Sequence, residues 1–234
     1  MDGPGTIPSR QDQPHPHSTF TDPTGAFLLS ADLGADLIRI FAISDTGKLT
    51  ECPTAAATPG TGPRHGAFRT EGDATVLYVV NELGNSVTSW TVSYEGDCLA
   101  LTEDQIVSTY PEGTTPPAGS KASEIIVRDS FIYATNRADK TFGQTSDSIA
   151  LFEVGGDGFS FVELADAGAN FPRTFDMNAA GDMVAVGGQT SSDVVIIERN
   201  VTSGRLGPVL AKLQIGTPGA EQQEDGLSAV IWHE

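Results

Sequence analysis

A segment of roughly fifty residues recurs four times along the chain, and each copy consists of short β-rich runs separated by turns rich in Asp, Asn and Gly. In each copy an apolar run ends on a polar residue: Asp32, Glu82, Arg137 and Gln189, spaced 50, 55 and 52 residues apart. A repeat of this length made of short strands is typical of the blades of a β-propeller. A single blade cannot bury both of its faces, so neighbouring blades must stack around a common axis.

A second polar position comes before the first turn of each copy. His17, Arg64, Glu124 and Arg173 occupy it, and in three of the four copies a glycine follows eight residues later. Equivalent positions in equivalent blades point to the same place, so we expect both polar sets to converge on one central channel. A ring of His, Arg and Glu side chains there predicts a binding or catalytic site.

The repeat also predicts how the chain is organised. We expect an irregular lead-in over residues 1–13 and a partial propeller domain over residues 14–234. The expected blades span 14–58, 62–108, 121–165 and 171–212, and a last inner strand spans 226–233. Four blades and one strand leave open apolar faces, which predicts self-association through them.

Composition narrows the partners of the chain. The formal net charge of −18 argues against nucleic acid or an anionic membrane surface as a partner. The sequence contains no stretch of 18 consecutive apolar residues, so no membrane-spanning helix is expected. The first residues also lack the apolar region of a signal peptide. If the substrate is an anion, its binding must depend on the few arginines inside the channel.

Two cysteines, Cys52 and Cys98, fall near the outer ends of successive blades. A disulfide would need their Cα atoms within about 7 Å of each other, and we expect two unpaired thiols instead. Neither cysteine has a Cys or His neighbour at zinc-site spacing, so no metal site is expected. Low cysteine use favours the cytoplasm.

The order of the motifs resembles one known family, the seven-bladed propeller lactonases, which includes 6-phosphogluconolactonases and carboxy-cis,cis-muconate lactonising enzymes (cyclases). The motifs are PHPHS, DLGADLIRIF, GPRH, YVVNELGNSV, ATNR, PRTF and AVGGQ, and the resemblance runs from about residue 11 to the end. Members of that family carry further blades before the HPH element. We therefore expect a fragment, a truncated gene product or a chain completed by another copy.

The resemblance implies catalytic roles for His17, Arg64, Glu82 and Arg137, with no cofactor and no metal. Lactone hydrolysis needs a general base to activate water and a positive charge or donor where the carbonyl oxygen gains charge. His17 or Glu82 is suited to take the proton of the water, and Arg64 and Arg137 are suited to bind a phosphate or carboxylate. The residues expected to bind substrate or line the channel are His15, Asp32, Glu124, Arg173 and Gln189.

Structural roles remain open for several of these residues. His15 and His17 could be merely solvated, and Arg64 and Arg173 could form an ion network with Glu82 or Glu124. His65 should point away from Arg64 and pack between blades, because successive residues of a strand face opposite sides. Packing roles are also expected for Trp90, Trp232, Phe41 and Phe152.

The sequence thus predicts an all-β propeller of the seven-bladed lactonase type, here about four blades plus one closing strand. The resemblance implies hydrolysis of a sugar lactone such as 6-phosphogluconolactone, with a small anionic lactone or carboxylate as the bound molecule. One alternative is a carboxy-cis,cis-muconate cyclase, which would use the same residues. A second alternative is a non-catalytic propeller fragment that serves as an interaction module.

Overall fold

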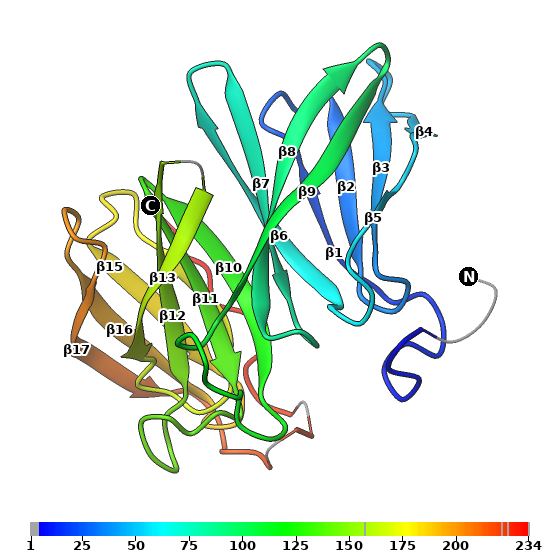
Figure 1. Ribbon diagram of the computed structural model, residues 1–234. Coiled ribbons are helices and arrows are strands. Elements are labelled where there is room, and N and C mark those ends of the chain that lie inside the picture. The colour runs from blue at the N-terminus through cyan, green and yellow to red at the C-terminus, as the bar shows by residue number, and fades with distance from the viewer. Residues whose placement is uncertain (1–4, 157, 221, 224, 234) are drawn as a thin grey trace. The chain divides into compact units, whose positions relative to one another are not determined.

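The computed structural model describes residues 5–156, 158–220, 222–223 and 225–233, and within these ranges the structure is all-β (Figure 1). The strands β1 to β17 form four antiparallel sheets, and no helix occurs in this described part. Consequently no described helix is long and apolar enough to cross a membrane. The chain divides into two compact units, residues 1–107 and 108–234, and each unit contains two of the sheets.

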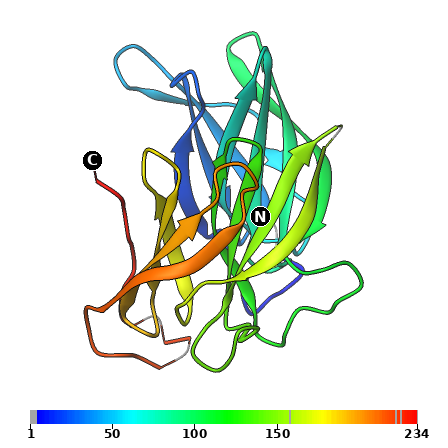
Figure 2. The same ribbon diagram turned by 90° about the vertical axis from the view of Figure 1, so that its left-hand side faces the viewer.

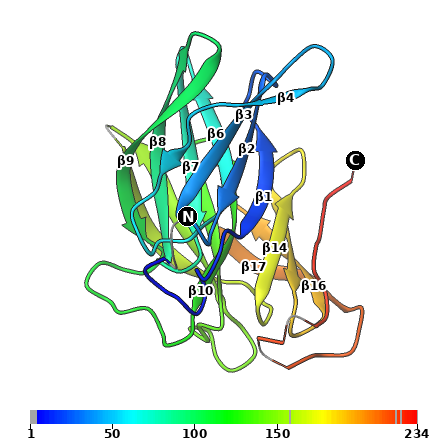
Figure 3. The ribbon, with the colours of Figure 1, turned by 90° about the vertical axis from the view of Figure 1, so that its right-hand side faces the viewer.

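The first unit contains two meandering sheets, in which each strand pairs with the next one along the chain (Figure 3). The first sheet consists of β1 (Pro16–Thr21), β2 (Phe27–Asp32), β3 (Leu37–Ile43), β4 (Leu49–Glu51) and the short β5 (Ala55–Ala56), which pairs with β3. The second consists of β6 (Pro63–Glu71), β7 (Ala74–Asn81), β8 (Ser86–Glu95) and β9 (Cys98–Ser108). A turn at residues 44–47 joins β3 to β4, with Gly47 at a φ of +76°.

The second unit repeats this arrangement (Figure 2). Its first sheet consists of β10 (Lys121–Arg128), β11 (Phe131–Arg137), β12 (Ser148–Gly155) and β13 (Gly158–Asp166). Its second consists of β14 (Pro172–Met177), β15 (Met183–Gly188), β16 (Asp193–Arg199) and β17 (Leu206–Gln214). The strand content of the four predicted repeats is therefore confirmed.

The core of each unit lies between its two sheets. In the first unit Leu29 and Ile38 of one sheet belong to the same buried cluster as Leu77, Val79 and the predicted packing residue Trp90 of the other. A middle strand such as β11 is buried at all of its residues, so the side chains on both of its sides are shielded from solvent. This two-sided burial explains why the apolar runs of the sequence alternate so imperfectly.

A buried aspartate in each unit holds the segment that leads into the second sheet. In the first unit the carboxylate of Asp36 accepts hydrogen bonds from the N–H groups of Gly60 (2.7 Å) and Gly62 (2.8 Å), just before β6. In the second unit Asp147 accepts the N–H of Phe171 (2.7 Å), just before β14. The two aspartates, here called the latch aspartates, fix the start of the following inner strand.

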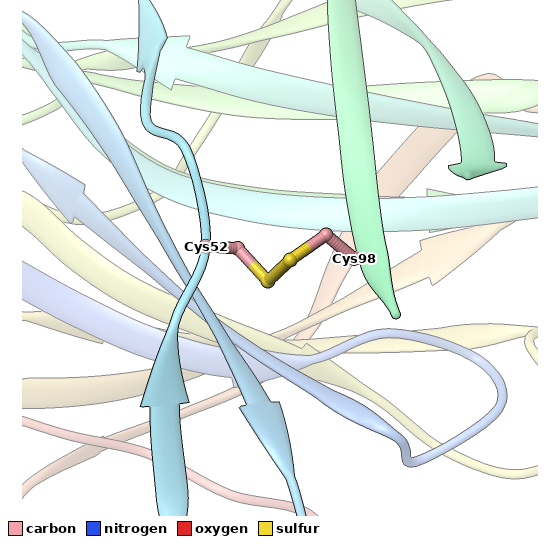
Figure 4. The surroundings of a disulfide bond; sticks show 2 residues. All are labelled: Cys52 and Cys98. Atoms are coloured by element: carbon pink, nitrogen blue, oxygen red, sulfur yellow. A yellow bond between two sulfur atoms is a disulfide. The ribbon is translucent and has the colours of Figure 1, made fainter. Parts of the chain in front are cut away.

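Cys52 and Cys98 form a disulfide, so the prediction of two unpaired thiols is wrong (Figure 4). The bond joins the segment after β4 to the first residue of β9, and the two Cα atoms lie 5.8 Å apart. It therefore links the two sheets of the first unit. This pairing depends on how neighbouring sheets pack, which the spacing of the cysteines in the sequence does not reveal.

The structure also differs from the prediction at residues 226–233, which form no strand. The C-terminal segment follows an irregular path, drawn in red in Figures 2 and 3. Trp232 donates its backbone N–H to the side chain of Asp176 at 2.8 Å. Because this bond goes to a carboxylate rather than to a backbone carbonyl of β14, no ladder begins there, and Ile231 stays 79% exposed.

Removing the disulfide should destabilise the first unit. A disulfide closing a loop with a sequence separation of 46 residues is expected to contribute about 4 kcal/mol through the lost entropy of the unfolded chain. The Cys52→Ser, Cys98→Ser double variant should therefore lose about that free energy of unfolding in urea titrations under non-reducing conditions. A reducing agent should lower the stability of the unmodified protein and leave the double variant unchanged; equal stability of both proteins without reductant would contradict the bond.

Candidate functional site

The first strand of each sheet, here called the inner strand, is interrupted by a bulge or register shift near its first residue. The inner strands are β1, β6, β10 and β14. The regular pairing breaks between Pro16 and Ser18 in β1, Pro63 and His65 in β6, Ala122 and Ile125 in β10, and Pro172 and Thr174 in β14. The predicted residues at these breaks, here called the bulge set, are His17, Arg64, Glu124 and Arg173. A bulge residue lies outside the regular ladder and its side chain is re-aimed. The polar repeat of the sequence therefore has a common backbone cause.

The second polar set lies at the same end of each sheet as the bulge set. The first residue of each inner strand pairs with the last part of the next strand, as Pro16 does with Asp32 and Lys121 with Arg137. Each sheet therefore carries one member of each set at one edge. The first unit holds His17, Asp32, Arg64 and Glu82, and the second holds Glu124, Arg137, Arg173 and Gln189.

A serine of the neighbouring sheet binds a bulge arginine in both units. Ser18 of β1 donates its hydroxyl to the backbone carbonyl of Arg64 at 2.6 Å. Ser123 of β10 donates in the same way to the carbonyl of Arg173 at 2.8 Å. A carbonyl displaced from a ladder needs such a partner when it is shielded from water. The two serines therefore help to fix the backbone from which each arginine side chain projects.

Glu82 binds two arginines at once. Its Oε2 atom accepts from Nε of Arg64 at 2.9 Å, and its Oε1 atom accepts from Nη2 of Arg10 at 2.5 Å. The side chains of Arg64 and Glu82 are 1% and 4% exposed, whereas that of Arg10 is 36% exposed. We call these three residues the arginine–glutamate row. Arg10 was missed by the sequence analysis because it lies in the lead-in, which has no counterpart in the other repeats.

The two neighbouring histidines of the HPH motif have different surroundings. His17 is half-buried, and its ring lies 5.0 Å from the ring of His65 on the adjacent sheet. His15 is 41% exposed on its side chain, and its Nε2 atom lies 2.9 Å from Oδ1 of Asp12. This hydrogen bond from His15 lowers the pKa of the Asp12 carboxyl. His65 thus packs against a neighbour, as expected, and His15 belongs to a surface pair.

Asp32, a predicted substrate-binding residue, is buried and hydrogen-bonded to nearby residues of its own unit. It is 0% exposed, and its carboxylate accepts the N–H of His15 at 2.7 Å. The same carboxylate accepts the N–H of Ala35 at 3.1 Å and two bonds from Arg39, the shorter being 2.7 Å. These four bonds occupy the acceptor positions of a carboxylate, so little capacity is left for a substrate.

In the second unit Arg137 is held close to its own sheet. Its side chain is buried, donates from Nη2 to the carbonyl of Ala122 at 3.3 Å, and lies over the ring of Phe171 with 5.1 Å between the guanidinium carbon and the ring centre. Phe171 has a φ of +59°, and the latch aspartate Asp147 binds its N–H. The aspartate therefore supports the aromatic surface on which Arg137 rests.

The other three predicted residues of the second unit, Gln189, Glu124 and Arg173, differ in how far they are buried. Gln189 is 3% exposed and donates its N–H to the carbonyl of Phe171 at 2.9 Å, while its side-chain Oε1 atom has no hydrogen-bond partner among the described residues. Glu124 and Arg173 are half-buried.

Burial raises the pKa of Asp139, which follows Arg137 closely in the chain. Within the described ranges no group of three or more His, Cys, Asp or Glu could hold a metal ion.

Replacing Glu82 should destabilise the first unit strongly. Glu82→Gln leaves two guanidinium groups without their shared carboxylate, and breaking a buried ion pair costs about 3–5 kcal/mol. The matched control is Glu71→Gln, because Glu71 is 74% exposed in its pair with Arg69. This surface pair should contribute about 0–1 kcal/mol. Urea unfolding of both variants checks the difference, and equal losses would show that burial of the row adds nothing.

The sequence matches the family model described as "Lactonase, 7-bladed beta-propeller" over residues 1–222. Among curated proteins, a probable 6-phosphogluconolactonase of Arthroderma benhamiae is 37% identical over 213 residues, which are 89% of this chain and 53% of the relative. The 6-phosphogluconolactonase of Bacillus subtilis is 31% identical over 199 residues, 84% of this chain and 54% of the relative. The chain thus spans about half the length of these curated relatives.

The fold of the chain also resembles that of several solved structures. A protein from Lactobacillus plantarum superposes with a TM-score of 0.78 at 30% identity, covering 92% of this chain and 59% of that structure. The periplasmic gluconolactonase of Pseudomonas aeruginosa superposes with a TM-score of 0.75 at 25% identity, covering 90% of this chain and 57% of that structure.

Proposed function

Because the chain belongs to the seven-bladed β-propeller lactonase family, we propose that it hydrolyses a sugar lactone such as 6-phosphogluconolactone. The observation that carries the proposal is the bulge set. At the start of its inner strand each sheet carries an irregularity that releases a His, Arg or Glu side chain from the ladder. Side chains of these types supply the base and the anion-binding groups that lactone hydrolysis needs.

His17 is the proposed general base. It takes a proton from water, the water oxygen attacks the lactone carbonyl carbon, and the ring C–O bond then breaks. The protonated His17 returns its proton to the released ring oxygen, and the new carboxylic acid loses its own proton to the solvent, so that the product is a hydroxy acid in its carboxylate form. The half-buried position of His17 against His65 supports this role, because the packed ring has few alternative orientations.

Arg64 and Arg137 are the proposed anion-binding residues. A guanidinium group can donate two parallel hydrogen bonds to a phosphate or carboxylate, or stabilise the charge that grows on the carbonyl oxygen. Both side chains are buried and tied to their own sheets, which favours a fixed orientation. Glu82 then acts as a positioning residue rather than the base, since each of its oxygens already binds an arginine.

Within the second unit, taken by itself, Glu124, Arg173 and Gln189 are the proposed substrate-binding residues. The buried Oε1 atom of Gln189 supports this assignment, because a buried acceptor without a partner among the described residues is suited to a substrate hydroxyl. His15 is proposed only for the margin of the site, given its exposed pair with Asp12.

The first test is turnover of freshly prepared 6-phosphogluconolactone, with spontaneous hydrolysis subtracted and the product identified by NMR. His17→Asn should lower kcat by about 10²–10⁴-fold, the usual contribution of a general base. The control is His233→Asn, because His233 is exposed in the irregular C-terminal segment. This variant should keep the rate of the unmodified chain.

Three outcomes would contradict the proposal. Full activity of His17→Asn would show that His17 is not the general base. Turnover by the unmodified chain no faster than the spontaneous reaction would favour the non-catalytic alternative, and lactone formation from a carboxymuconate would favour the cyclase.

We also propose that the protein works in an oxidising compartment. The sequence favoured the cytoplasm because it has few cysteines, but both of them join in the Cys52–Cys98 disulfide. Such bonds persist mainly outside the reducing cytosol. Alkylation and peptide mapping of the protein isolated from its own cells should yield the cross-linked Cys52–Cys98 peptide. Recovery of both cysteines in alkylated form would instead support the cytoplasm.

A further inference from the structure

Residues 5–15, the described part of the segment before β1, form a fixed loop, although the sequence predicts only an irregular lead-in. Its centre is Gln11, which is 0% exposed. The side chain of Gln11 donates to the carbonyl of Leu33 at 3.0 Å and accepts the N–H of Ile7 at 3.0 Å. Gly34 permits the close approach, because a Cβ atom there would lie 1.9 Å from the carbonyl oxygen of Gln13.

This loop places Arg10 at the exposed end of the arginine–glutamate row. The backbone N–H of Arg10 donates to the carbonyl of Ile7 at 2.9 Å, so the residue belongs to a closed turn. Its Nη2 atom lies 2.5 Å from Glu82, and Arg64 binds the other oxygen of the same carboxylate. The backbone and one end of the side chain are therefore both fixed before any ligand arrives.

Arg10 still has donors to offer. A guanidinium group carries five N–H donors, and Glu82 is the one side-chain partner that the structure shows for Arg10 among the described residues. With 36% of its side chain exposed, Arg10 is the member of the row that a dissolved molecule can reach. The guanidinium stays charged at any working pH, so its attraction for an anion persists.

We propose that Arg10 is a specificity-determining residue that binds the phosphate group of a phosphorylated sugar lactone. This inference rests on the proposed function. The net charge of −18 repels anions in general, so a fixed cation in reach of solvent has a large effect on which lactones are bound. Glu82 holds the guanidinium in place, and the turn in the lead-in loop holds the backbone of Arg10.

The kinetic test compares 6-phosphogluconolactone with the uncharged glucono-δ-lactone. Arg10→Gln should lower kcat/KM for the phosphorylated lactone by about 10- to 100-fold, mainly through KM, as expected for loss of one charge-assisted contact. The same variant should change kcat/KM for the neutral lactone by less than about twofold, because no phosphate is present to lose a contact.

Arg39→Gln is the matched control. Arg39 is 33% exposed and pairs with the buried carboxylate of Asp32 at 2.7 Å, so it resembles Arg10 in charge, exposure and partner. This control should leave the ratio of the two kcat/KM values unchanged. Thermal unfolding of both variants shows whether each is folded at the assay temperature. An equal fall for both lactones in Arg10→Gln, or no fall for either, would overturn the proposal.

A binding measurement separates this inference from the proposed function. Calorimetric titration with 6-phosphogluconate and with inorganic phosphate should show binding that weakens about 10- to 100-fold in Arg10→Gln and is retained in Arg39→Gln. Such a result would support the Arg10 site even if the chain hydrolyses no lactone. Equal affinity of Arg10→Gln and the unmodified chain, or no binding by either, would overturn it. Gluconate, which lacks the phosphate, should bind both proteins equally weakly. If Arg10→Gln weakened the binding of gluconate alone, that result would also overturn the proposal.

Discussion

The latch aspartates are the interaction on which the rest of each unit depends. A four-stranded sheet with two apolar faces is stable only when a neighbour covers it, and the neighbour must be held in register. Asp36 and Asp147 meet this need with charge-assisted hydrogen bonds to the backbone just ahead of β6 and β14. Because those segments enter directly into the bulges, the same bonds that hold two sheets together also place Arg64 and Arg173. Stability and site geometry therefore have one origin in this fold.

Much of the fold and part of the candidate site follow from the sequence because they depend on local backbone pattern. The repeat located the four sheets, and its polar lead-in positions coincide with the breaks in regular pairing at His17, Arg64, Glu124 and Arg173. A bulge needs a distinctive residue at a fixed place in the strand, so it leaves a periodic trace.

The features that escaped prediction depend on packing between non-equivalent segments. The Cys52–Cys98 bond requires the facing of two sheets, and Arg10 reaches Glu82 across 72 residues of chain from a loop without a repeat. Asp32 occupies the repeat position of Glu82, yet the neighbouring Arg39 and two backbone N–H groups consume its carboxylate. Equivalent positions thus share a location but differ in their hydrogen-bond partners, because those partners are the side chains and N–H groups that lie beside them.

The bulges have a consequence for how such a protein changes over time. A residue inside a ladder is constrained by its cross-strand neighbours, whereas the residue at a bulge is released from that constraint, and this chain places an imidazole, two guanidinium groups and a carboxylate at equivalent points. The scaffold consequently places side chains of different chemistry at equivalent points of a common strand pairing. Apart from Arg64, whose buried pair with Glu82 also stabilises the first unit, mutation at these points can vary the side chain while the surrounding strand pairing stays intact, which makes the repeat a natural platform for divergence and for directed evolution.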